Sequence, residues 1–119
     1  HPFPLSNQRR AMRALDVDCC CGIAHNGVIR LTSNPSNTKY SDTAIFITDY
    51  LSQMIKKPRN LRDKAFLSNV YDIAGSKFAI MDGGGYVATV GPFVNERGLL
   101  FSNGSFEQYG GRNGFRYAV

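Results

Sequence analysis

The sequence of 119 residues predicts an α+β fold, a two-layer sandwich in which two helices pack on one face of a mostly antiparallel sheet. Three observations support this prediction. The Asn26-Gly27 pair lies between two β-type runs, two capped helical segments follow between positions 41 and 75, and the apolar spacing then returns to a period of two. Strands therefore precede and follow a pair of helices, which is typical of an α+β domain.

The composition indicates one folded domain. Hydrophobic residues make up 43% of the chain and charged residues 19%, so the chain has enough apolar surface to form a core. No apolar run approaches the length of a membrane span. The net charge of +5 favours contact with anionic surfaces such as nucleic acid, phosphate head groups or acidic proteins.

Residues 1–13 are predicted to form a flexible leader or pro-segment, ahead of a single α+β domain over residues 14–119. The leader contains two prolines and shows no periodicity. Its Arg9-Arg10 pair is a candidate processing site, because secretory-pathway proteases cut at dibasic pairs.

The first strands are predicted to form a hairpin over residues 14–33. Asn26-Gly27 suits a type I′ turn, in which both central residues need positive φ, and such a turn would leave His25 in solvent. Residues 28–32 form its second strand. In its first strand, alternation places Cys19 and Cys21 on one face and Cys20 on the other.

A first helix is predicted to begin after Ser41, which is a good N-cap residue, and to stop at Pro58. Asp42 lies in its first turn, and Lys56 and Lys57 lie in its last turn, where each charge complements the helix dipole. Its buried stripe consists of Ala44, Ile47, Leu51, Met54 and Ile55.

A second helix is predicted over residues 61–74, with Asn60 as its N-cap and Gly75 as its C′ residue. Its inward-facing residues are Phe66, Val70, Ile73 and Ala74.

The last third of the chain is predicted to be β structure. Residues 77–81 and 86–90 form a hairpin through the turn at 82–85, and residues 99–101 add a short strand. Asn-Gly pairs at 103–104 and 113–114 indicate further turns, with a final strand at 115–119.

The three cysteines are consecutive, and neighbouring residues of one strand cannot easily form a disulfide with each other. They are interpreted as buried thiols, with two alternatives: an intermolecular disulfide through Cys20, or metal or redox chemistry. Their spacing matches no zinc pattern, so no metal and no cofactor is expected.

The densest positive charge lies at Lys56, Lys57, Arg59, Arg62 and Lys64. These cations either complement a helix C-terminus or bind an anionic partner. The candidate binding residues are Cys20, Arg30, Lys56, Lys57, Arg59 and Arg62.

Residues 26–35, followed by a helix, resemble the middle of PIN-domain toxin ribonucleases. That resemblance implies converging carboxylates that hold metal ions. The candidate carboxylates are Asp16, Asp18, Asp72 and Asp82.

A second resemblance involves small secreted fungal proteins. The three cysteines ahead of residues 26–31 are similar to the Cys-x-Cys strand of a smut killer-toxin subunit, and Arg9-Arg10 fits kexin-type processing. The chain lacks the many disulfides of those toxins. The resemblance implies a secreted virulence effector that binds a host protein or a second effector, with no catalytic residues to carry over.

The sequence thus favours a secreted, non-enzymatic interaction protein that binds through an exposed sheet face or a strand edge, as a monomer or a homodimer. The alternative is a PIN-like, metal-dependent ribonuclease or another nucleic-acid-binding toxin.

Overall fold

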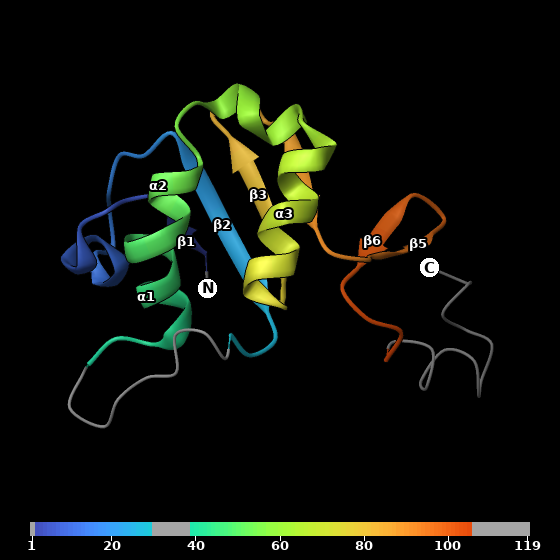
Figure 1. Ribbon diagram of the computed structural model, residues 1–119, viewed down its shortest axis with the longest axis horizontal. Helices are drawn as coiled ribbons and strands as arrows, with labels where there is room; N and C mark the ends of the chain where they lie inside the picture. The colour runs from blue at the N-terminus through green and yellow to red at the C-terminus, as the bar shows by residue number, and fades with distance from the viewer. Residues whose placement is uncertain (1, 30–38, 106–119) are drawn as a thin grey trace.

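The computed structural model describes residues 2–29 and 39–105 (Figure 1). The chain has the predicted α+β fold, with a four-stranded antiparallel sheet of order β1-β2-β3-β4 and a separate antiparallel pair, β5-β6. The strands are β1 (Phe3–Pro4), β2 (Cys21–Asn26), β3 (Lys77–Asp82), β4 (Val87–Val90), β5 (Val94–Glu96) and β6 (Leu99–Phe101). The helical elements are η1 (Arg9–Arg13), α1 (Asp42–Phe46), η3 (Ile47–Leu51), α2 (Ser52–Met54), η4 (Pro58–Arg62) and α3 (Lys64–Ala74).

The predicted hairpin over residues 14–33 is wrong. Strand β2 lies between β1 and β3: β3 pairs with all six of its residues on one edge, and β1 pairs with Gly22 and Ile23 on the other. Only Gly27 of the expected turn has a positive φ, at +135°, and a type I′ turn needs two such residues. Val28 and Ile29 are not in a strand, and residues 30–32 lie outside the described part of the chain. His25 consequently lies in β2 and is half-buried, not in an exposed turn.

Residues 2–13 belong to the fold and do not form a flexible leader. Phe3 and Pro4 pair with Ile23 and Gly22, and the N–H of Leu5 donates to the carbonyl of Cys21 at 2.9 Å. The side chain of Met12 is only 3% exposed. Cleavage at Arg9-Arg10 stays a prediction.

The first helix begins as predicted. The hydroxyl of Ser41 accepts a hydrogen bond from the N–H of Ala44 at 3.2 Å, and Asp42 lies in the first turn. The helix contains one π turn, η3, and ends at Met54, so Lys56 and Lys57 lie beyond its last turn. Pro58 then opens the 3₁₀ turn η4.

The second helix is capped by Asp63 in place of Asn60. The carboxylate of Asp63 accepts hydrogen bonds from the N–H groups of Ala65 and Phe66, whereas the Asn60 side chain accepts from Lys56 and Lys57 and so fixes the start of η4. Gly75 ends α3 with φ +63°, as predicted. Ile73, predicted to face inward, is exposed.

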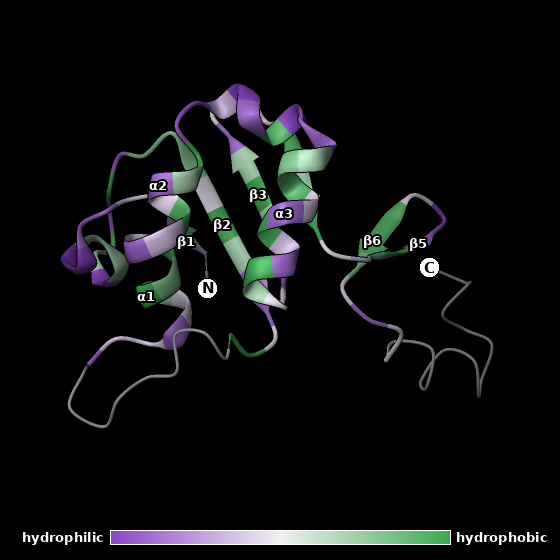
Figure 2. Ribbon diagram, in the orientation of Figure 1, coloured by the Kyte–Doolittle hydropathy of each residue, from purple (hydrophilic) through white to green (hydrophobic). Residues whose placement is uncertain are grey.

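One hydrophobic core joins the helices to the sheet. The rings of Phe46 in α1 and Phe78 in β3 stack with 5.7 Å between their centres. Apolar residues alternate along β2 and β3 (Figure 2), because successive strand residues face opposite sides. The largest fully buried residues include Ile23, Phe46, Ile47, Leu51, Leu61, Val70, Phe78, Ile80 and Val90.

The second half of the sheet follows the prediction closely. Strands β3 and β4 form the expected hairpin, in which the carboxylate of Asp82 accepts hydrogen bonds from the N–H groups of Gly84 and Tyr86. Strand β6 occupies the predicted residues 99–101 and pairs with β5. The predicted turn at 113–114 and strand at 115–119 lie outside the described residues.

Candidate functional site

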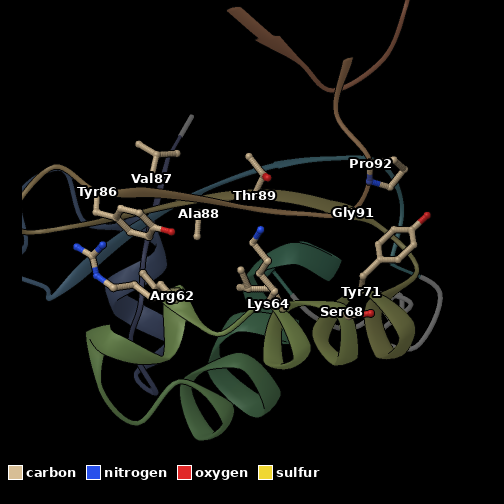
Figure 3. Close-up of a pocket in the computed structure, with 12 residues that line it drawn as sticks. Arg62, Lys64, Ser68, Tyr71, Tyr86, Val87, Ala88, Thr89, Gly91 and Pro92 are labelled. Atoms are coloured by element: carbon tan, nitrogen blue, oxygen red, sulfur yellow. The ribbon is translucent and has the colours of Figure 1, made fainter. Parts of the chain in front are cut away.

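A groove of about 480 Å³ lies between helix α3 and strand β4 (Figure 3). Strand β4 forms one wall, α3 and the end of η4 form the other, and apolar side chains line the floor. We call it the edge groove. It is lined by Leu61, Arg62, Lys64, Leu67, Ser68, Tyr71, Tyr86, Val87, Ala88, Thr89, Gly91 and Pro92.

Strand β4 is the last strand of its sheet, so no strand of the described chain pairs with its outer edge. The N–H of Asp82 donates to the carbonyl of Tyr86 at 3.0 Å, so these two residues form a hydrogen-bonded pair at the start of the β3–β4 ladder. Main-chain groups of an antiparallel strand point alternately to its two neighbours. The N–H and C=O groups of Ala88 therefore face β3, and those of Val87 and Thr89 face the edge groove.

One end of the edge groove is closed by Arg62 and Tyr86. The guanidinium carbon of Arg62 lies 3.9 Å from the centre of the Tyr86 ring. The N–H of Tyr86 is held by Asp82 Oδ1 at 3.0 Å, so the residue that carries the ring is fixed by the hairpin turn. This contact orients a cation along the groove wall.

The other end is formed by Tyr71 and Gly91. Gly91 has φ +88°, and a Cβ added there would lie 2.8 Å from two carbons of the Tyr71 ring. The ring can approach the strand this closely only because residue 91 has no side chain. The edge groove is thus framed by two tyrosines, one from each wall.

The lining carries two cations, Arg62 and Lys64, and no carboxylate. Asp63 lies between them in the sequence, but its carboxylate is engaged at the start of α3. Within residues 2–29 and 39–105 the one ion pair joins Arg9 to Asp49, so neither groove cation is neutralised by a described acidic side chain. The groove is therefore positively charged along its α3 wall.

The structure brings only one predicted binding residue, Arg62, into the edge groove. Lys56, Lys57 and Arg59 are exposed near η4 but do not line it. Cys20 is exposed immediately before β2, and Arg30 lies outside the described residues.

Sequence reasoning missed the two tyrosines and Lys64 as groove residues. Lys64 belongs to the basic cluster of the sequence but not to the candidate binding residues, and that cluster was the one available signal for it.

The cysteines differ sharply in their surroundings. Burial, together with the hydrogen bond to Cys20, raises the pKa of the Cys21 thiol to about 12. Cys19 and Cys20 are exposed. The interpretation as buried thiols is confirmed for Cys21 and is wrong for Cys19 and Cys20, because β2 begins only at Cys21 and the two preceding residues are exposed.

The carboxylates expected of a ribonuclease do not converge. Asp16, Asp18, Asp72 and Asp82 all lie in the described part of the chain, and no three histidine, cysteine or acidic residues gather there as a ligand set for a metal ion. Among the same residues, no helix is long and apolar enough to cross a bilayer.

Comparisons with models of known families, with curated proteins and with solved structures found no match to this chain.

Proposed function

We propose that this chain is a non-enzymatic interaction protein that binds an extended, acidic segment of a partner protein as a fifth strand beside β4. The observation that carries this proposal is the outer edge of β4, which pairs with no strand of the described residues and whose Val87 and Thr89 main-chain groups face a cationic groove. Peptides that add to a sheet edge gain affinity from main-chain hydrogen bonds and specificity from alternate side chains.

The chemistry of the partner follows from the two sides of such an added strand. Side chains on the α3 side would meet Arg62 and Lys64, which favours glutamate or aspartate. Side chains on the other side would lie beside the exposed side chain of Val87 and, across the sheet, that of Met81, which favours apolar residues. The preferred segment therefore alternates acidic and apolar residues.

Strand β4 is a better docking edge than the opposite edge of the same sheet. Strand β1 has only two residues, and one of them is Pro4, which has no N–H to donate. Strand β4 has four residues and no proline. Pairing of two copies through β4 would bring the cations of both copies together, so like-charge repulsion disfavours a homodimer at this edge.

The proposed compartment and the proposed class of partner are inferred from the sequence. The small size, the net charge of +5 and the similarity of the cysteine strand to secreted fungal proteins support a secreted effector whose partner is a host protein or a second effector. The dibasic Arg9-Arg10 pair supports the same compartment.

The experiment that tests the proposal is a titration of the full chain with two acetylated, amidated peptides of equal length. One alternates glutamate and valine, and the other alternates lysine and valine. We expect the glutamate peptide to bind at least about tenfold more tightly. It should also slow amide hydrogen exchange at Val87 and Thr89, because both N–H groups would become hydrogen-bonded.

Two results would contradict the proposal. Equal affinity for the two peptides would show that the charge of the groove does not select the partner. Chelator-sensitive cleavage of an RNA oligonucleotide by the full chain would favour the ribonuclease alternative instead.

A further inference from the structure

The two ends of the edge groove differ in charge, and strand β4 runs from one end to the other. Tyr86 directly precedes β4 and Gly91 directly follows it. Arg62 lies at the Tyr86 end, with its guanidinium carbon 3.9 Å from the ring centre, and Figure 3 shows Lys64 between this end and Gly91. Because a strand extends by about 3.3 Å per residue, the four residues of β4 separate the two ends by about 13 Å. A segment bound beside β4 would therefore have one end at a guanidinium and the other end well away from it.

The guanidinium of Arg62 is oriented and still has donors to offer. Its face lies on the Tyr86 ring, and its five N–H donors lie in the plane of the group. The N–H of Tyr86 donates to Asp82 Oδ1 at 3.0 Å, so the residue that supports the guanidinium is anchored in the hairpin turn. In the part of the chain that the structure describes, no carboxylate pairs with Arg62. Its fork of donors therefore suits a carboxylate of a bound segment, which accepts two parallel hydrogen bonds from such a group.

A second guanidinium, that of Arg59, lies on the same face of η4. A 3₁₀ helix has three residues per turn, so the side chains of Arg59 and Arg62, three positions apart in η4, eclipse each other. One turn is about 6 Å long, which is shorter than the screening length of about 10 Å at 0.1 M salt. Arg59 is exposed and does not line the groove, but its charge adds to the attraction that Arg62 exerts on an anion.

The charge at the Tyr86 end determines the direction of a bound strand. A strand antiparallel to β4 would bring its carboxyl-terminal end to Arg62, whereas a parallel strand would bring its amino-terminal end there. A terminal carboxylate is negative at neutral pH and a terminal amine is largely positive, so the guanidinium attracts the first and repels the second. Antiparallel pairing is also slightly more stable per residue than parallel pairing. Both effects favour an antiparallel strand.

The contact between Arg62 and Tyr86 also closes this end of the groove. A segment that continued past it would have to leave the groove, whereas a segment that stops there places its last residue beside the guanidinium. A chain terminus therefore fits the closed end better than the middle of a chain.

We propose that the segment bound in the edge groove is the carboxyl terminus of the partner protein, antiparallel to β4, with its terminal carboxylate on Arg62. This inference rests on the proposed function and deepens it, because it names the part of the partner that binds and its direction. Since β4 has four residues, the last four or so residues of the partner would make the main-chain contacts.

The test uses the full chain and three peptides that share one alternating glutamate–valine sequence. The first is acetylated and has a free carboxyl terminus, and the second is acetylated and amidated. The third is succinylated and amidated, so it has the same net charge as the first but carries the additional carboxylate at its amino end. We expect the first peptide to bind at least about tenfold more tightly than either of the others, because only its terminal carboxylate reaches Arg62.

Three variants assign this preference to Arg62. Arg62→Gln should remove it, so that the three peptides bind with similar affinities. Arg62→Lys keeps the charge but not the planar fork and should restore only part of it. Lys64→Gln is the matched control, because it also removes one cation of the lining but not the one at the closed end. It should weaken all three peptides and leave their affinity ratios unchanged.

The direction of the strand is measured on the wild-type chain. A nitroxide attached through the acyl group at the amino end of the free-carboxyl peptide broadens nearby amide signals of the protein. We expect the Gly91 amide to broaden more than the Val87 amide, because an antiparallel strand begins at Gly91. Stronger broadening at Val87 would overturn the inference, and this readout does not depend on the folding of any variant.

The remaining outcomes separate this inference from the proposed function. Equal affinities of the three peptides, each still above that of the lysine–valine peptide, would overturn the carboxyl-terminal assignment and leave strand addition intact. A preference for the free carboxyl terminus that survives Arg62→Gln would place the carboxylate elsewhere and would also overturn the assignment. The absence of binding by all three peptides would overturn strand addition and this inference together.

Discussion

The guanidinium of Arg62 lies over the ring of Tyr86, with 3.9 Å between the guanidinium carbon and the ring centre. Arg62 is in η4 and Tyr86 directly precedes β4 at the far wall of the groove, so this contact joins the two walls. Cation–π contacts at exposed sites contribute about 0.5–1 kcal/mol. The same contact holds a charge that no described carboxylate neutralises.

Reversal of the groove charge should weaken peptide binding. We expect Arg62→Glu or Lys64→Glu to lower the affinity for the alternating glutamate–valine peptide by about tenfold, since each places a carboxylate where the peptide carries its own. Arg13→Glu changes the net charge equally but lies on η1, and it should leave the affinity nearly unchanged. The measurement is isothermal titration at two salt concentrations. An equal loss in all three variants would indicate long-range attraction and no specific contact at the groove.

Proline should have different effects at β4 residues whose N–H faces the groove and at β4 residues whose N–H faces β3. Thr89→Pro removes an N–H that faces the groove, so we expect the chain to stay folded and the peptide affinity to fall at least about threefold. Ala88→Pro removes an N–H that faces β3 and should destabilise the fold. Urea denaturation and peptide titration of both variants give the comparison. A folded Thr89→Pro variant with undiminished affinity would contradict strand addition at this edge.

Local signals predicted much of the fold. Ser41 and Gly75 act through their nearest neighbours, and the structure places an N-cap and a left-handed C-terminus at these residues. The helix predicted to stop at Pro58 ends at Met54 instead, and Pro58 opens η4. The β3–β4 hairpin is also local, with its glycine turn between two alternating runs. In contrast, Asn26-Gly27 lacks a hairpin because strands distant in sequence, β1 and β3, occupy both edges of β2.

The groove and the contact between His25 and Ser76 depend on packing that no local pattern encodes. Tyr71 lies in α3 and Tyr86 lies directly before β4, and only the packing of α3 on the sheet places both at the groove. His25 and Ser76 are 51 positions apart and meet only because β2 and β3 are adjacent. Arg62 was identified from the density of charge, which does not tell which member of a basic cluster lies beside a sheet edge.

Substitution of Gly91 should destabilise the chain. Gly91→Ala would force a side chain into a positive φ and against the Tyr71 ring, and we expect a loss of about 1–3 kcal/mol in the free energy of unfolding. Gly83→Ala is the control, because Gly83 has no heavy atom within 4 Å of an added Cβ and no positive φ. It should change stability by less than about 0.5 kcal/mol. Similar urea midpoints for the two variants would show that the Tyr71–Gly91 contact is not tight in solution.

The three cysteines should react unequally with iodoacetamide. Cys19 and Cys20 are exposed, whereas burial raises the pKa of Cys21 to about 12 and leaves almost no thiolate. Intact mass measurement of the reduced, native chain should therefore show two rapid additions, and Cys20→Ser should show one. The chain in denaturant should take up three. A rapid third addition under native conditions would mean that β2 opens at Cys21.

Acid should destabilise the fold through His25. Because burial lowers the pKa of His25 in the folded chain below 6.5, the unfolded chain binds more protons once the pH falls below that value. This contribution to the free energy of unfolding is therefore constant above about pH 7 and decreases as the pH falls toward the folded-state pKa. His25→Gln keeps a hydrogen-bonding side chain but cannot titrate, so its urea midpoint should change less between pH 7 and pH 5 than that of the wild type. Parallel curves for the two proteins would place His25 in solvent.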